Sequence, residues 1–211
     1  MRHPGLRKAL TDDHTRRAQR LHAILVHEGW ACSRGSLLTV SGRRWVAALQ
    51  LHPGARAQVD AMLSVMCAVA EQIDLIDCEL RRMAKTDERL KALQQIFGIG
   101  PILAATILAE IGDAKRFRRA RQVVRPAGLD PVVKDSADKQ RRGHLAKQGA
   151  PCLRWALVEA AQHACRKNSP DHELYVRARG HAGANPATLT VARKIGKRAF
   201  HVLRELETQA A

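Results

Sequence analysis

A pair of glycines separated by one residue, Gly98 and Gly100, has the spacing of a site that binds phosphate through the protein backbone. Apolar residues with helical spacing end just before the pair, and Pro101 pre-sets the backbone for a second helix directly after it. The order apolar-Gly-apolar-Gly, followed by Ala104, is the helix-hairpin-helix signature. Because glycine has no side chain, backbone N–H groups at the start of the second helix are accessible to a phosphate oxygen. The sequence therefore predicts a contact to the DNA backbone that reads no bases; the alternative is a tight corner between two helices that binds nothing.

Basic residues follow this predicted turn closely: Lys115, Arg116, Arg118, Arg119 and Arg121. The stretch 115–154 has 12 basic and 3 acidic residues, in a chain of net charge +16. Such an excess favours a polyanionic partner. We expect double-stranded DNA, with Gly98, Gly100, Arg118 and Arg119 among its contacts. The alternative is a basic protein whose charge serves only its solubility.

Cysteine and histidine usage indicates no metal site. The five cysteines form no CxxC pair, and the ten histidines include no HExxH motif. We therefore expect reduced, buried thiols, no metal ligands and no cofactor in this chain. No run approaches the ~18 apolar residues of a membrane helix, and the N-terminus lacks the apolar stretch of a signal peptide. These features predict no membrane partner and a soluble protein of the bacterial cytoplasm, associated with the nucleoid.

A heptad-like pattern runs through residues 55–90. Apolar residues recur there at alternating steps of three and four: Val59, Met62, Met66, Val69, Ile73, Ile76, Leu80 and Met83. The pattern skips at Asp87 and resumes at Leu90. A period of 3.5 residues favours two helices that wind around each other, and the five basic and seven acidic residues of this segment do not favour DNA. We expect coiled-coil or antiparallel pairing that makes the chain a homo-oligomer; the alternative is a long helix packed against its own domain.

The remaining apolar spacing predicts further helices and no strand. These helices are expected at residues 6–28, at 45–51 within a connector, at 150–167, after Ser169-Pro170-Asp171, and from an N-cap at Asn185 with Pro186 in first position. The predicted fold class is mainly α, with a long coiled-coil-like helix followed by a helical domain that contains the helix-hairpin-helix. The predicted domains are a helical remnant and connector at 1–54, the coiled-coil helix at 55–90 and a C-terminal domain at 91–211.

The order of motifs in the second half of the chain resembles one family. "FGIGPILAATILAEIGDAKRF" is followed by "AGLDP", by a serine in a polar loop and by "RRGHLAKQGAPCLRWALVEAA". This series is similar to the C-terminal transposase domain of the IS110/IS116/IS902 insertion-sequence family, over residues 90–206. The helix at 6–28 and the heptad segment also resemble the middle region of that family.

The resemblance implies a nucleophile at Ser136. In that family the serine after the Gly-Leu-x-Pro element attacks a DNA phosphodiester and stays joined to the strand. A serine hydroxyl needs activation, and cations must stabilise the charge of the phosphorane. Five basic residues are candidates for that role and for DNA contacts: Lys134, Lys139, Arg141, Arg142 and Lys147. The chain departs from the family at Ala137, where glycine is usual, and a serine between Asp135 and Asp138 is, taken alone, an ordinary loop residue.

Family members begin with an RNase H-like domain that carries three Asp and one Glu as metal ligands. Residues 1–54 hold only Asp12, Asp13 and Glu28 as acids, and the first two lie in a predicted helix. We therefore expect a transposase, or site-specific DNA recombinase, truncated at its N-terminus, with Mg²⁺ only where an acidic domain is supplied elsewhere. The resemblance also implies a guide non-coding RNA as a partner. The alternative is a non-catalytic DNA-binding remnant, or a modulator that pairs with a full-length transposase.

Overall fold

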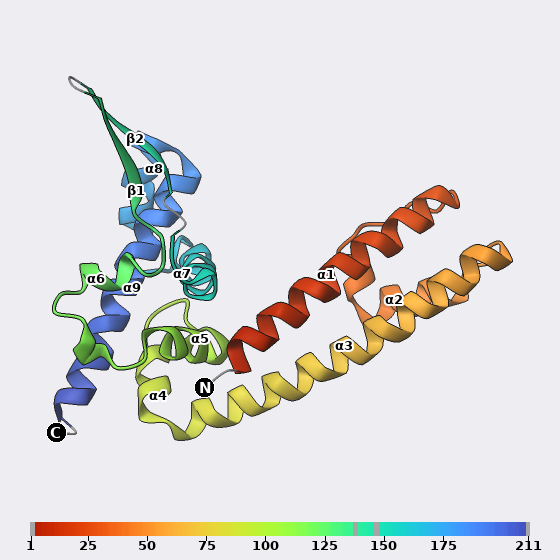
Figure 1. Cartoon of the computed structure of the whole chain (residues 1–211), viewed down its shortest axis with the longest axis horizontal. Helices are drawn as coiled ribbons and strands as arrows, with labels where there is room; N and C mark the ends of the chain where they lie inside the picture. Colours follow the sequence, from red (N-terminus) through yellow and green to blue (C-terminus); the bar gives the residue numbers. More distant parts are fainter. Residues whose placement is uncertain (1–2, 137–138, 146–147, 210–211) are drawn as a thin grey trace. The chain divides into compact units, whose positions relative to one another are not determined.

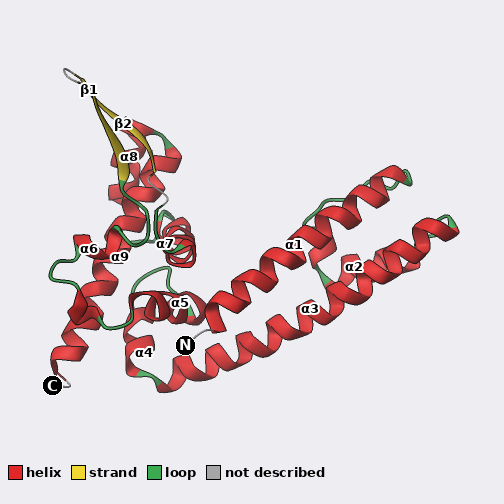
Figure 2. Cartoon of the chain, viewed as in Figure 1, coloured by secondary structure: helices red, strands yellow, loops and turns green. Residues whose placement is uncertain are grey.

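The computed structural model describes residues 3–136, 139–145 and 148–209, and helices dominate it (Figures 1 and 2). The predicted mainly α fold class is confirmed. The chain forms two compact units. The N-terminal unit consists of residues 5–79, and the C-terminal unit of residues 80–211 together with residues 1–4. The domain boundaries predicted at residues 54 and 90 stay predictions.

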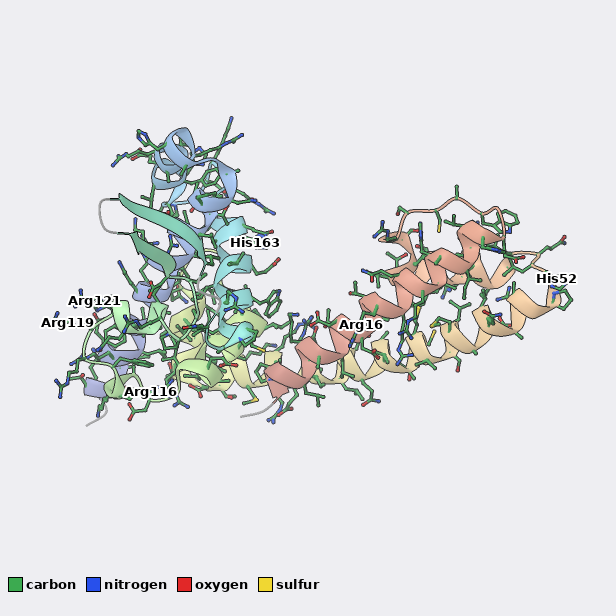
Figure 3. All side chains as sticks on the ribbon, turned by 45° about the horizontal axis from the view of Figure 1, so that its top comes forward. Arg16, His52, Arg116, Arg119, Arg121 and His163 are labelled. Atoms are coloured by element: carbon green, nitrogen blue, oxygen red, sulfur yellow. The ribbon has the colours of Figure 1, made fainter. Side chains whose placement is uncertain are left out.

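Two long helices run side by side in the N-terminal unit (Figures 1 and 3). Its elements are α1 (His3–His27), the 3₁₀ helix η1 (Ser36–Leu38), α2 (Val40–Ala48) and α3 (Pro53–Thr86). The predicted helix at 6–28 corresponds to α1, in which Leu6 is 53% exposed. The helical patch expected at 45–51 begins earlier, since Gly42 lies inside α2 and not at a break. A Cβ at Gly42 would approach the carbonyl oxygen of Ser36 to 1.9 Å, so glycine there permits close packing of α2 on η1.

The heptad-like residues of α3 pack, in their first half, against α1 of the same chain. The buried cluster combines side chains of both helices and of the connector: Ala18, Leu21, Leu25, Leu37, Val46, Val59, Leu63 and Met66. At the opposite end of the pair, Arg7 Nη2 donates to Asp77 Oδ2 at 3.1 Å, so the two helices are antiparallel. Further along α3, Val69, Ile73 and Ile76 are half-buried. Pairing of α3 between subunits stays a prediction.

The helix predicted to reach Leu90 ends at Thr86, and a new helix starts at Glu88 with Asp87 as its N-cap. Asp87 Oδ1 accepts from the backbone N–H of Arg89 at 2.8 Å. The skip in the heptad pattern therefore coincides with a real helix boundary.

Helices α4, α5, α7 and α9 enclose the core of the C-terminal unit. Its described helical elements are α4 (Glu88–Gln94), α5 (Pro101–Ile111), η2 (Ala114–Arg116), α6 (Arg121–Val124), α7 (Pro151–Ala164), α8 (His172–Ala182) and α9 (Ala184–Gln209). α5 packs on α4 and α7, and α9 packs on α4, α6, α7 and α8. The buried Asp171 pairs with Lys194 and Arg198, which fastens the start of α8 to α9.

A two-stranded antiparallel hairpin interrupts the helices, and it corrects the prediction of a helical unit without strands (Figure 2). The strands are β1 (Pro131–Ser136) and β2 (Lys139–Leu145). Only Val132 and Val133 give this segment β-branched character, and the remaining positions are mostly polar. Because most positions of both strands are polar, the apolar alternation that signals a strand is absent from this segment.

Two further predictions were wrong in detail. Asn185 lies inside α9, because the first helical bond runs from Ala187 N–H to Gly183 O and places the cap two residues earlier. All five cysteines are free thiols, but none is fully buried: Cys67 and Cys78 are exposed, and the other three are partly exposed.

Candidate nucleic-acid interface

The turn between α4 and α5 is closed by a backbone hydrogen bond from Ile99 N–H to Ile96 O, at 3.0 Å. Gly98 adopts φ 91°, a left-handed conformation that favours glycine. A Cβ at this position would approach the carbonyl oxygen of Ala160, on α7, to 2.4 Å. Glycine at position 98 is therefore required by the turn and by its packing on α7, while its proposed contact with DNA stays a prediction.

Gly100 has a different environment. It is the N-cap of α5, with φ −90° and ψ 178°, and a Cβ there would meet nothing within 4 Å. Ala104 N–H donates to Gly100 O at 2.9 Å, and this is the first helical bond of α5. The N–H groups of Ile102 and Leu103 precede that bond and so have no partner inside the helix. This end of α5 is open to an external acceptor such as a phosphate oxygen.

A cleft of about 610 Å³ lies directly at this turn. It is lined by the turn residues Gln94–Gly100 and by three residues from the C-terminal end of α7 and the segment after it, His163, Arg166 and Asn168. These three side chains are exposed (Figure 3 shows His163 on α7). Sequence reasoning missed all three, because nothing in the spacing of the glycines shows which distant helix packs on the turn.

The basic run after α5 forms an exposed surface, which we call the α6 surface: Lys115, Arg116, Arg118, Arg119, Arg121 and Arg125. Figure 3 shows Arg116, Arg119 and Arg121 around α6 at one end of the C-terminal unit. Within the described residues, Arg118, Arg119 and Arg121 form no ion pair with an acidic side chain. Their charges therefore remain available to an external anion.

The backbone of the α6 surface is held firmly in place. Gln122 Oε1 accepts from the N–H groups of Arg118 and Arg119, at 2.7 and 2.9 Å. Arg204, on α9, donates through Nη1 to the carbonyls of Phe117 and Arg118, at 3.2 Å each. A second cleft, of about 560 Å³, lies beside this segment and is lined in part by Arg116, Arg118 and Arg125.

The hairpin places Ser136 at the last position of β1 and not in the polar loop that the sequence suggested. In the backbone register Ser136 is opposite Lys139, and Lys134 is opposite Arg141. Residues two apart on a strand, and directly paired residues, share one face of a ribbon, so these four positions belong together. Arg142 is opposite Val133 and belongs to the other face. Lys147 lies outside the described residues.

The base of the hairpin is clamped to α7 and α9. Ala150 N–H donates to Pro126 O at 2.7 Å, and a Cβ at Gly149 would approach that oxygen to 2.0 Å. Arg154 Nη1 donates to Ala127 O at 3.1 Å. Arg193 Nε donates to Leu129 O at 2.8 Å. The "AGLDP" and "GAPCLR" segments therefore pack together at the hairpin base and fix where β1 and β2 leave the helices.

Helix α7 connects the turn to the hairpin. Its N-terminal end holds the hairpin base through Ala150 and Arg154, and its C-terminal half holds the turn through Ala160. Ten residues of helix separate positions 150 and 160, or about 15 Å. The structure thus joins Gly98, Gly100 and the hairpin carrying Ser136 through one rigid element. Arg118 lines a separate cleft, together with Arg116 and Arg125.

Among the described residues, no three His, Cys, Asp or Glu side chains are grouped closely enough to hold a metal ion. Mg²⁺ supplied by an acidic domain elsewhere stays a prediction. Within the described part of the chain, every helix is too short or too polar to traverse a lipid bilayer.

Fold and charge together define a mainly α, strongly basic domain with a two-stranded hairpin inserted between its helices. Residues 90–177, which include the turn, the α6 surface and the hairpin, match the Transposase IS116/IS110/IS902 family. The chain therefore carries the transposase domain of this family, as the motifs indicated.

Curated relatives agree with this assignment. The chain is 31% identical over 130 residues to the "Insertion element IS116 uncharacterized 44.8 kDa protein" of Streptomyces clavuligerus, covering 61% of this chain and 33% of that protein. It is 28% identical over 165 residues to the "Transposase for insertion sequence element IS1111A" of Coxiella burnetii, covering 76% of this chain and 45% of that protein. A "Probable family 20 transposase" of Pseudomonas aeruginosa is 33% identical over 95 residues, or 45% of this chain and 28% of that protein. The matched regions thus span less than half the length of these relatives.

Proposed function

We propose that this chain is the DNA-engaging part of an IS110-type transposase and that it binds double-stranded DNA through the α4–α5 turn and the α6 surface. The observation that carries the proposal is the open N-terminus of α5 at Gly100, joined through α7 to the hairpin whose first strand ends at Ser136. Backbone N–H groups and exposed arginines contact phosphates and so position a duplex without reading its sequence.

Duplex binding is tested by fluorescence anisotropy across a range of salt concentrations. The double variant Arg118→Glu/Arg119→Glu is expected to weaken binding and to reduce the dependence on salt. A control with the same change of net charge, Arg16→Glu/Arg20→Glu, alters exposed positions in the N-terminal unit. Equal losses in both variants would mean that overall charge, and not the α6 surface, determines binding.

The proposal assigns the role of nucleophile to Ser136. Its Oγ attacks a DNA phosphorus, the bond from that phosphorus to one deoxyribose oxygen breaks, and a serine–phosphate ester forms. The serine hydroxyl loses one proton and the released deoxyribose oxygen gains one, so the step balances and the ester stays available for rejoining. Lys134, Lys139 and Arg141 are the cations that the register assigns to the same face.

A covalent protein–DNA adduct is the direct test of Ser136. We expect one when duplex DNA, Mg²⁺ and the acidic domain of a full-length relative are added together, and we expect Ser136→Ala to abolish it. An adduct that persists in Ser136→Ala would overturn the assignment. Absence of an adduct from wild-type protein that binds DNA would favour the non-catalytic modulator.

Two further partners belong to the proposal: a guide non-coding RNA and a second copy of the chain, paired through residues 55–90. Sedimentation velocity tests the second of these. Substitution of Val69, Ile73 and Ile76 by glutamine should yield monomers if α3 pairs between subunits, because these heptad positions are only half-buried within one chain. An unchanged sedimentation coefficient would exclude pairing through that stretch.

A further inference from the structure

We propose that the C-terminal end of α7 is a second phosphate contact, in which Arg166, supported by His163 and Asn168, holds a backbone phosphate beside the one at the α4–α5 turn. The inference rests on the proposed function and adds DNA contacts that neither the glycine pattern nor the basic run contains. Its basis is the cleft of about 610 Å³ that these residues share with Gly98 and Gly100.

The chemistry of the cleft lining favours an anion. One guanidinium, one imidazole and the side-chain amides of Gln94, Gln95 and Asn168 line it, together with apolar side chains and backbone, and none of its lining residues is acidic. A guanidinium offers paired N–H donors that match two oxygens of one phosphate. His163, Arg166 and Asn168 are exposed, so a polymer that passes over the surface can reach them.

Several carbonyls at the end of α7 accept hydrogen bonds from the protein, which weakens the repulsion of an anion there. Cys165 N–H donates to Ala161 O at 3.0 Å, and Arg166 N–H donates to His163 O at 3.2 Å. The carbonyl of Cys165 accepts from His172 Nδ1 at 2.9 Å. These donors partly offset the partial negative charge of the helix C-terminus, and the guanidinium of Arg166 adds a positive charge beside it.

Packing of α7 on the turn makes the cleft preformed. The backbone of Gly98 packs so closely on α7 that an added Cβ would stand 2.4 Å from Ala160 O. His163 lies one helical turn beyond Ala160 and therefore on the same face of α7. The segment after α7 is also fixed, since Ser169 is buried and its N–H donates to Arg166 O at 2.9 Å. A preformed site loses little conformational entropy when it binds.

Neighbouring residues of equal charge provide a matched test. Arg166 lines the cleft and Lys167 does not, and both are exposed. We expect Arg166→Gln to weaken duplex binding about tenfold, as for loss of a charged hydrogen-bonded contact, and to lower the salt slope by about one. Lys167→Gln should change affinity less than about threefold, since it loses only long-range attraction. Arg166→Lys should restore part of the binding, and far-UV circular dichroism should show every variant folded.

Failure of this inference is distinguishable from failure of the proposed function. If wild-type protein binds duplex DNA and Arg166→Gln behaves as Lys167→Gln does, the α7 contact is wrong while the proposed function stands. If wild-type protein does not bind duplex DNA at low salt, the proposed function falls and this inference falls with it.

Discussion

Gly98 and Ala160 lie in contact across the C-terminal unit: a Cβ at position 98 would stand 2.4 Å from the carbonyl oxygen of Ala160. The two residues are 62 positions apart in sequence, and their contact docks the α4–α5 turn on α7. Gly100, two residues later, has open space where its Cβ would be. The glycine pair thus combines one residue needed for packing with one that leaves a helix terminus accessible.

Substitution of Gly98 should therefore destabilise the protein, whereas substitution of Gly100 should not. Gly98→Ala combines a left-handed backbone with a clash against a backbone oxygen, and we expect it to lower the free energy of unfolding by about 2 kcal/mol or more. Gly100→Ser places a good N-cap residue in open space and should stay within about 0.5 kcal/mol of wild type. Urea denaturation followed by far-UV circular dichroism measures both. Equal stability of the two variants would contradict the contact with Ala160.

The clamp at the hairpin base should control how often the hairpin opens. Arg193→Met removes the hydrogen bond from Arg193 Nε to Leu129 O. We expect amide hydrogen exchange in residues 131–136 and 139–145 to become several-fold faster, about 1 kcal/mol of lost local protection. Lys197→Met is the matched control, because Lys197 is an exposed cation on the same helix. Exchange rates that respond equally to both substitutions would show that Arg193 does not hold the hairpin.

Stability of the N-terminal unit should fall as the solution is acidified from pH 7 to pH 5. Burial lowers the pKa of His14 below its ordinary value of 6.5, the charge of Arg43 lowers it further, and Asp13 partly offsets both. A histidine with a depressed pKa binds more protons when unfolded, so its contribution is complete above pH 6.5 and is lost as pH falls through the folded pKa. One such group changes the free energy of unfolding by at most about 1.4 kcal/mol per pH unit.

Two variants separate His14 from other titrating groups. His14→Leu should flatten the dependence on pH between 7 and 5, whereas His27→Leu, at an exposed position on the same helix, should leave it unchanged. Urea midpoints from the fluorescence of Trp30 and Trp45, in a Trp155→Phe background, report on this unit. A pH dependence that survives His14→Leu in full would refute the assignment.

Local sequence signals made the α4–α5 turn predictable. The residues that pack around the turn have no such signals and could not be predicted. Gly98, Gly100 and Pro101 determine their own backbone conformations, so the ends of α4 and α5 could be placed without a structure. The contact of Gly98 with Ala160 depends on long-range packing, which spacing does not encode. For the same reason the cleft residues His163 and Arg166 were not predicted.

The difference between local signals and long-range packing also explains what the sequence did and did not predict for the hairpin and for the heptad segment. Ser136 was expected in a loop because residues 134–144 are almost all polar, and a polar ribbon carries no alternation to detect. The heptad pattern predicted the helix α3 correctly, while pairing of α3 between copies of the chain stays a prediction. A heptad pattern does not identify the helix with which it pairs. For Val59, Leu63 and Met66 that helix is α1 of the same chain.

The central claim, that the open N-terminus of α5 holds a DNA phosphate, is tested most directly by Gly100→Asp against Gly100→Asn. Both residues are favourable N-caps and fit the extended backbone at this position, so both variants should fold and be as stable as wild type or more so. Only aspartate adds a negative charge where the phosphate would lie. In anisotropy titrations with duplex DNA we expect Gly100→Asp to lose at least about tenfold more affinity than Gly100→Asn, with the gap narrowing at high salt. Equal affinities for the two folded variants would contradict the claim.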